Sequence, residues 1–388
     1  MYVHARTLGW LVRRALFRKP FSFRRCLYAA GFGFAQVTLG PVVALARAFD
    51  RLAYPEFSAL PVPAPLFVIA TPRSGTTYLH HLLELDEERF FSCKLYQTIL
   101  PSITLERALE GAAELDASTG RLFGRLTDAI DRRMFTDWEA IHRVSLRSAE
   151  EDENLFVSSL TSPALYLLFP FIRELPEFVE IGRLGGRAVR RVAEDYRETV
   201  RRWIYLQGDG RTPLIKNVLL PSRLTVSDRA FPEARYVHVV RDPREAIPSA
   251  VSMFYAMWQS HSPHIAADSP ATRALADMFL THYRMLCDEG RKRPPDRWVQ
   301  VRYESLIDDP VATVEQIYAA FGFPLSAAFR ARLEHAAGEA RRFKSRHRYD
   351  PSEFGLTDGD LRAGLGEHWQ SVVSATPLRP EPVQRTSV

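Results

Sequence analysis

The amino-acid sequence predicts a three-layer α/β/α fold in which helices cover both faces of a central parallel sheet. Two apolar runs, 66–70 and 236–240, have the length and continuous hydrophobicity of strands that are buried on both faces. Stretches with helical periodicity separate these runs, as the crossover connections of parallel strands require. The first run leads through a short turn into a helix, which places polar residues at the edge where such folds bind ligands.

Composition narrows the class of protein. The 388 residues are 46% hydrophobic and 25% charged, which is typical of a folded globular chain. The net charge is +5, but residues 1–49 hold eight Lys or Arg and no Asp or Glu, so the remainder carries 5 − 8 = −3. A body with this charge excludes nucleic acid as a partner. The three cysteines are widely spaced and predict neither a disulfide framework nor a cysteine metal site.

The first element is a basic and apolar segment over residues 1–53. Its 21 uncharged residues, 26–46, are close to the roughly 20 that cross a bilayer as a helix, although Gly31, Gly33 and Pro41 weaken a span. Three alternatives stay open: a helix at a membrane surface, a single span, and a helical hairpin packed on the body or on a partner copy. We expect a peripheral protein on the cytoplasmic face of a membrane, with a single-span protein as the alternative.

The remaining elements follow in order. A Pro-rich linker over residues 54–65 precedes a catalytic-sized domain at 66–375, and a frayed tail over 376–388 ends the chain. Within the domain we expect strands at 66–70, 213–216, 236–240 and 298–301, and helices at 76–85, within 105–147, at 188–206 and at 271–290.

A P-loop-like segment, Ala70-Thr71-Pro72-Arg73-Ser74-Gly75-Thr76-Thr77, joins the first strand to its helix. The free N–H groups and the dipole of a helix N-terminus make such a turn an anion site. Ala70 stands where a nucleotide-binding P-loop has its first Gly, and Thr76 stands where it has the Lys that neutralises the outer phosphates. Arg73 instead supplies a cation within the loop.

This loop resembles the 5′-phosphosulfate loop of sulfotransferases, which use 3′-phosphoadenosine 5′-phosphosulfate (PAPS). A second block, 231–243 followed by Ser249, resembles the segment of that family that binds the 3′-phosphate. Weaker echoes at 301–306 and 347–356 extend the likeness, the latter to a bacterial-type subfamily. The resemblance implies that Arg73, Ser74, Gly75, Thr76, Thr77, Arg241 and Ser249 bind PAPS, and that no metal is needed.

The resemblance also implies transfer of a sulfonate to an acceptor hydroxyl, which needs a general base. The Glu that many relatives carry after the loop is missing here, and the acidic cluster 150–153 is the best replacement, with Glu153 and Asp152 as the candidate bases. Residues His80, His81, His142 and His347 are further candidates, and Lys216 is a candidate contact for the sulfonate or the acceptor.

Several functions remain open at this stage. The acceptor is a carbohydrate, a lipid headgroup or a small alcohol, and the membrane-associating segment favours one that is lipid-linked. The alternatives to a sulfotransferase are a kinase-like nucleotide enzyme on the same fold and a catalytically inactive, membrane-attached nucleotide-binding scaffold. The missing P-loop Lys argues against the first alternative, and the presence of Arg73, Arg241 and Ser249 argues against the second.

Overall fold

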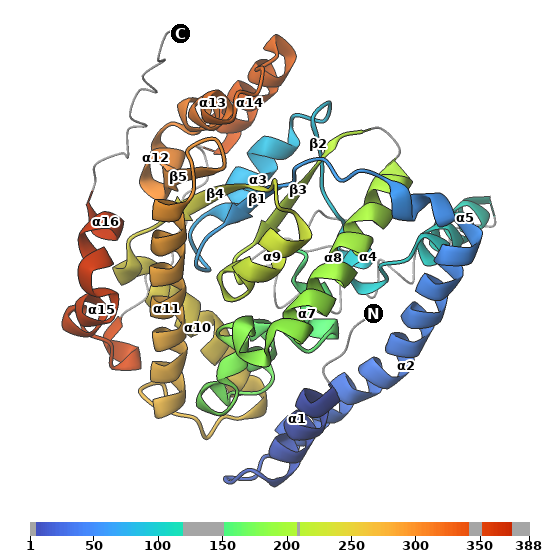
Figure 1. Cartoon of the computed structure of the whole chain (residues 1–388). Coiled ribbons are helices and arrows are strands. Elements are labelled where there is room, and N and C mark those ends of the chain that lie inside the picture. The colour runs from blue at the N-terminus through green and yellow to red at the C-terminus, as the bar shows by residue number, and fades with distance from the viewer. Residues whose placement is uncertain (1–4, 119–150, 208–209, 341–350, 375–388) are drawn as a thin grey trace.

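The protein is built around a five-stranded parallel sheet with strand order β2-β3-β1-β4-β5 (Figure 1). This computed structural model describes residues 5–118, 151–207, 210–340 and 351–374. The strands are β1 (Leu66–Ile69), β2 (Phe90–Phe91), β3 (Thr212–Asn217), β4 (Arg235–Val240) and β5 (Trp298–Arg302). β1 lies between β3 and β4, so the loop after β1 opens at the centre of the sheet.

Side chains alternate along β1 and build a layer on each face of the sheet. Leu66 and Val68 pack with the apolar side chains of α3 (Thr76–Glu84), α13 (Pro310–Phe321) and α14 (Ala327–Ala340). Phe67 and Ile69 pack on the other face with α8 (Gly186–Gln207), α9 (Leu224–Ala230) and Leu286 of α11 (Pro270–Lys292). Since successive residues of a strand point to opposite faces, a continuous apolar run is what two buried faces require. The three-layer α/β/α prediction is confirmed.

A third apolar cluster lies beside the sheet, where α10 (Pro243–His261) packs against α11 and against the turn Pro163–Leu167, and α11 packs against the turn Ile172–Glu174. The remaining helices are α4 (Leu95–Ile99), α5 (Ile103–Ser118), α7 (Glu153–Ser158), α12 (Tyr303–Asp308), α15 (Asp358–Leu365) and α16 (Trp369–Val373). The 3₁₀ turns are η1 (Pro55–Ala59), η2 (Pro163–Leu167), η3 (Ile172–Glu174), η4 (Pro176–Phe178), η5 (Ile181–Leu184), η6 (Leu220–Arg223), η7 (Pro351–Phe354) and η8 (Gly366–His368).

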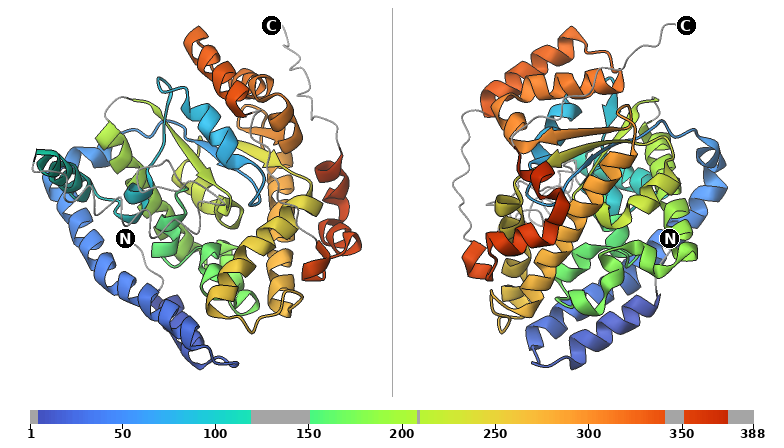
Figure 2. Two further views of the ribbon diagram at one scale, coloured as in Figure 1. Left: turned by 180° about the vertical axis from the view of Figure 1, so that it is seen from behind. Right: turned by 60° about the vertical axis from the view of Figure 1, so that its left-hand side comes forward.

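The N-terminal segment forms a helical hairpin of α1 (Ala5–Phe17) and the long helix α2 (Phe23–Ala53). α2 runs along one side of the body, and α1 folds back beside it (Figure 2). α2 contacts α10, α5 and η1. The segment therefore contacts the protein's own body, and α2 is also long and apolar enough to cross a membrane.

The strands and helices expected from the sequence match the structure closely where it describes them. Strand β2 has only two residues, too few to show a periodicity, and was not expected. The helical stretch expected within 105–147 is described only as far as the end of α5, and the expected tail lies outside the described residues. The boundary at the Pro-rich linker falls on η1 and the extended chain that leads into β1.

Candidate active site

The loop between β1 and α3 has a strained backbone that is set by two of its residues. Gly75 is the N-cap of α3 and has φ 81°, and Arg73 has φ 69°, in the left-handed region that residues with a Cβ rarely adopt. The Ser74 hydroxyl donates a hydrogen bond to the Thr71 carbonyl oxygen at 2.8 Å, which closes the turn. The loop therefore directs the N-terminus of α3 toward its centre, as an anion site requires.

Gly75 is needed at this position for a second reason. A Cβ on Gly75 would lie 2.6 Å from Cδ2 of Tyr303, at the start of α12. The same tyrosine ring supports the guanidinium of Arg241, whose central carbon lies 4.4 Å from the ring centroid. The close approach of α12 to the loop thus positions one of the two expected PAPS-binding arginines.

The two motifs found in the sequence meet in space. Arg73 Nε donates to Ser249 Oγ at 3.1 Å, and Arg241 Nη1 donates to the Arg73 carbonyl oxygen at 2.8 Å. Ser249 lies in the second turn of α10 and is 3% exposed. Arg241 is also paired with Glu245 at 2.8 Å on the first turn of that helix. Residues about 170 positions apart in sequence therefore form one cationic and hydroxyl-bearing site at the carboxyl ends of β1 and β4.

A lysine at the end of β3 extends this site. Lys216 Nζ donates to Thr77 Oγ1 at 3.2 Å, which brings a second cation to the first turn of α3. Glu151 Oε1 lies 3.8 Å from the same Nζ, and the Glu151 side chain is 24% exposed. Lys216 itself is only 4% exposed. The acidic segment expected from the sequence therefore touches the phosphate loop through Glu151 and Lys216.

Asp152, by contrast, is turned into the protein interior. It is fully buried and accepts hydrogen bonds from the Tyr196 hydroxyl and from Asn217 Nδ2, the latter at 2.6 Å. Burial raises the pKa of Asp152 to about 6, against the opposing effect of these two donors, and the charge of Glu153 adds to the rise.

Glu153 continues the same internal network. Its carboxylate is paired with the buried guanidinium of Arg223 and accepts hydrogen bonds from Ser162 Oγ and from Asn217 Nδ2, the latter at 2.8 Å. The aromatic ring of Phe156 lies over the Arg223 guanidinium, 4.0 Å from its central carbon. Asp152 and Glu153 thus link α7 to β3, η6 and α8, which fixes the position of Glu151 beside the loop.

A model of the sulfotransferase family matches residues 65–327, well over half of the chain. The chain belongs to the sulfotransferase family. As a PAPS-dependent sulfotransferase it transfers a sulfonate to an acceptor hydroxyl, so the family match decides against the kinase-like enzyme and the inactive scaffold. The bacterial-type resemblance stated from the sequence is confirmed.

Relatives of this sulfotransferase span most of its length. The omega-hydroxy-beta-dihydromenaquinone-9 sulfotransferase of Mycobacterium bovis is 28% identical over 315 residues, which cover 80% of this chain and 74% of the relative. The solved structures of sulfotransferase STF1 from Mycobacterium tuberculosis and STF9 from Mycobacterium avium have TM-scores of 0.68 and 0.67 at 19% and 18% identity. The first alignment covers 93% of this chain and 91% of STF1, and the second covers 98% and 99%. These two structures share the fold.

Two of the four histidines expected as alternative bases, His80 and His81, lie among the described residues. His80 is buried, and its Nε2 lies 3.2 Å from Ser92 Oγ. Burial, together with the charge of Lys216, holds the pKa of His80 well below its usual value. The same two causes lower the pKa of His81. His142 and His347 lie outside the described residues.

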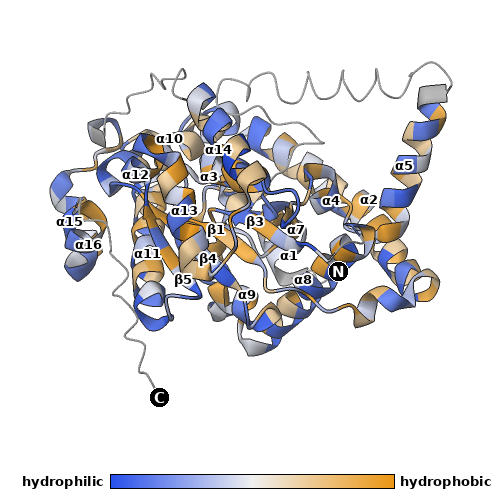
Figure 3. Ribbon diagram, turned by 90° about the horizontal axis from the view of Figure 1, so that it is seen from above, coloured by the Kyte–Doolittle hydropathy of each residue, from blue (hydrophilic) through white to orange (hydrophobic). Residues whose placement is uncertain are grey.

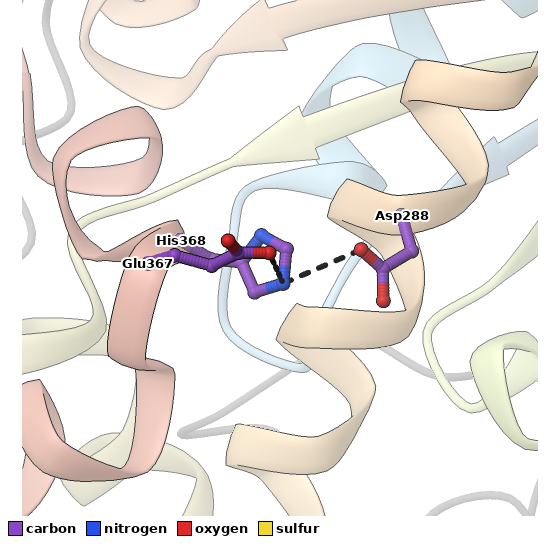
Figure 4. Close-up of side chains that lie close together, drawn as sticks. All are labelled: Asp288, Glu367 and His368. Carbon is purple, nitrogen blue, oxygen red and sulfur yellow. Dashed lines mark ion pairs between the residues drawn. The ribbon is translucent and has the colours of Figure 1, made fainter.

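Within the described ranges, one group of side chains is close enough to share a metal ion (Figure 4). His368 Nε2 lies 3.3 Å from Asp288 and 3.7 Å from Glu367. Arg291 pairs with both carboxylates as well, at 3.9 and 3.3 Å, so one cation already offsets part of their charge. The group belongs to α11 and η8, whereas the phosphate loop lies between β1 and α3. We therefore give it no part in the transfer.

Two positioning residues of the site were not expected from the sequence. Tyr303 lies in a stretch that the family resemblance included, but nothing in its local pattern indicated that its ring would support Arg241. Arg223 lies in η6 without any motif around it, and only the packing of α7 against η6 reveals it as the partner of Glu153.

Proposed function

We propose that the phosphosulfate end of PAPS binds at the N-terminus of α3 and its 3′-phosphate at Arg241 and Ser249. The observation that carries this proposal is the Arg73–Ser249 hydrogen bond, because it joins the two motifs into one site. Arg73, Thr76, Thr77 and the N–H groups from Ser74 to Thr77 supply donors to the phosphosulfate. An arginine fork and a serine hydroxyl suit a phosphate monoester.

The transfer itself then depends on position and charge. The acceptor oxygen forms a bond to sulfur while the bond from sulfur to the bridging phosphate oxygen breaks, and adenosine 3′,5′-bisphosphate leaves with that electron pair. Arg73 and Lys216 stabilise the negative charge that develops on the sulfonate and on the leaving oxygen. We propose that these two cations, with the dipole of α3, perform the neutralisation that a metal ion performs in many phosphoryl-transfer enzymes.

The acceptor proton goes to the acidic segment that the sequence singled out. Asp152 and Glu153, the two bases expected from the sequence, are occupied by buried donors from α8, β3 and η6. Glu151 is the described member of the segment that contacts Lys216 and is open to solvent. We therefore propose Glu151 as the proton acceptor, with Asp152 and Glu153 as the residues that hold it in place.

Three matched variants test the assignment of the base. Glu151→Gln should lower kcat by about a hundredfold or more and remove the acidic limb of the pH–rate profile, while the Kd for adenosine 3′,5′-bisphosphate stays unchanged. Glu153→Gln and Asp152→Asn should lower the free energy of unfolding and keep the shape of the profile. A wild-type pH–rate profile for Glu151→Gln would exclude Glu151 as the base. If the acidic limb of the profile disappeared only in Glu153→Gln, Glu153 would be the base, as the sequence predicts.

We propose that the acceptor is a lipid-linked or amphipathic alcohol, delivered at the cytoplasmic face of a membrane. The exposed apolar residues of α2 support a lipid-rich location, and the Mycobacterium bovis relative is named for a menaquinone derivative. All three cysteines are free thiols, as a reducing compartment favours. Incubation of the enzyme with sulfur-labelled PAPS and a cell extract, split into lipid and aqueous fractions, tests this. Label confined to the aqueous fraction would contradict it.

A further inference from the structure

Helix α2 has its polarity reversed relative to the surface helices of water-soluble proteins. Its buried positions include Arg47 and Asp50, which face the body of the enzyme, and Arg25, which faces α1 and the hairpin turn. On an ideal helical wheel, Leu27, Phe34 and Leu45 lie about 140–180° from this buried face. These three side chains are 62%, 72% and 73% exposed. Charged residues thus point inward and large apolar residues point outward.

The exposed apolar residues are concentrated on this hairpin. Figure 3 shows the apolar residues in orange along α2. Among the described residues, seventeen large hydrophobic side chains are exposed, and fourteen of them lie between residues 12 and 52. Surfaces of this kind mark an interaction with another molecule, because contiguous apolar patches are rare on soluble monomers. Two of the fourteen are set aside, because the Tyr28 ring packs 5.4 Å from the His261 ring and the wheel places Leu39 beside the buried Asp50. The other twelve, which we call the outer face, are Val12, Leu16, Phe17, Phe21, Phe23, Leu27, Phe34, Val37, Val42, Leu45, Phe49 and Leu52.

The C-terminal half of α2 is fixed to the enzyme by buried ion pairs. Asp50 pairs with Arg202 of α8 at 2.8 Å, and both side chains are fully buried. Asp50 also accepts hydrogen bonds from Ser102 Oγ at 3.0 Å and from the backbone N–H of Thr104 at 2.9 Å, at the start of α5. One turn earlier, Arg47 pairs with Asp195 at 2.7 Å. Separation of this half from the body would leave these charges without partners.

The N-terminal half is held by hydrogen bonds and ring contacts, which include those of Tyr28 with His261 and of Phe32 with Phe169. Arg25 donates to the carbonyl oxygens of Ala15, Arg18 and Pro20, which ties the start of α2 to α1 and to the turn between the helices. Ser22 Oγ donates to the carbonyl oxygen of His261 at the end of α10. With 31 residues, α2 is about 46 Å long, more than the roughly 30 Å of a bilayer core. A helix fastened to a folded domain at both ends cannot cross that core, so its outer face is available only to a surface alongside it.

We propose that the outer face lies in the plane of an anionic membrane, with α2 parallel to the surface and the enzyme body above it. Charge complementarity favours lipid over a second copy of the chain. Arg13, Lys19 and Arg24 are exposed around the hairpin turn, and residues 1–49 contain no Asp or Glu. Two copies joined by this face would bring the same cations together, whereas anionic headgroups neutralise them. The proposal rests on the packing of α2, whichever alcohol the enzyme sulfonates.

Flotation of the full chain with lipid vesicles tests the proposal. The protein should float with vesicles that contain phosphatidylglycerol, and the bound fraction should fall steeply with added salt or with pure phosphatidylcholine. Phe34→Glu and Leu45→Glu should each weaken binding by about tenfold or more without lowering the melting temperature, since both side chains are exposed. Ile307→Glu, a change at a 47% exposed position on α12, is the matched control and should bind like wild type.

Two further measurements separate the alternatives. Alkaline carbonate should extract the membrane-bound protein if α2 lies in the plane, and retention in the bilayer after this wash would overturn the proposal in favour of a span. A dimer in solution that fails to float and that Leu45→Glu converts to a monomer would overturn it in favour of a second copy. A full-length protein that binds vesicles but transfers no sulfonate to an alcohol would contradict the proposed chemistry and leave the membrane proposal intact.

Discussion

The contact between Gly75 and Tyr303 allows one substitution to be followed through the site. In Gly75→Ala the backbone of the new alanine would need to keep φ near 81°. Its methyl group would lie 2.6 and 2.8 Å from two carbons of the Tyr303 ring. The left-handed backbone costs about 1–2 kcal/mol for a residue with a Cβ. The ring must also move, which weakens the support of Arg241 by about 0.5–1 kcal/mol.

The sum is a loss of about 1.5–3 kcal/mol in the free energy of unfolding. The Kd for adenosine 3′,5′-bisphosphate should rise about two- to fivefold because Arg241 is displaced. Urea unfolding and titration calorimetry measure the two quantities. Gly338→Ala is the matched control, because a Cβ there meets nothing within 4 Å inside α14. It should stabilise the protein by up to about 1 kcal/mol.

A double-mutant cycle with Tyr303→Ala isolates the contact. Removal of the ring relieves the clash, so the destabilisation in the double variant should be smaller than the sum of the two single changes. Strictly additive effects, or a Gly75→Ala protein that unfolds and binds nucleotide like wild type, would refute the reasoning about the loop.

Four further predictions follow from the structure. Arg73→Ala should lower kcat about 100- to 1000-fold in a steady-state assay at an unchanged melting temperature, and wild-type turnover would remove Arg73 from the site. Asp50→Ala should lower the free energy of unfolding in urea by about 3–5 kcal/mol, because it leaves Arg202 buried and unpaired, and a loss below about 1 kcal/mol would contradict the clamp on α2. Burial raises the pKa of Glu106 to about 7, so this carboxyl holds its proton more tightly in the folded state than in the unfolded state. The free energy of unfolding should therefore decline between about pH 4.5 and 7. Glu106→Gln should flatten that decline when unfolding is measured as a function of pH. Dialysis against EDTA should leave the rate of sulfonate transfer unchanged, and a rate that falls and returns with Mg²⁺ would show that a metal ion takes part.

Much of the fold follows directly from the sequence, because each strand buried on both faces must be apolar throughout. This requirement makes β1 and β4 visible as continuous runs. β2 was missed, because two residues carry no pattern. Arg73, Arg241 and Ser249 could be proposed because their motifs resemble the PAPS-binding segments of sulfotransferases, and the strand–turn–helix anion site around Arg73 depends on local chain geometry.

The role of each acid could not be predicted in this way. Glu151, Asp152 and Glu153 are adjacent and chemically alike, yet their surroundings differ. Tyr196 and Asn217 surround Asp152, and Arg223 pairs with Glu153. These partners come from three separate elements, so the distinction arises only when α7 packs against them.

The N-terminal segment shows the same division. The sequence by itself determined that residues 1–53 are basic and apolar, and it predicted an anion-binding turn over residues 66–77, because both properties depend on neighbours along the chain. Only the tertiary structure decided that α2 is clamped along the body, since Asp50 and Arg47 meet Arg202 and Asp195 across about 150 residues of sequence. A pattern of hydrophobicity indicates which residues are apolar, but the burial of a charge depends on a partner that only folding brings into contact.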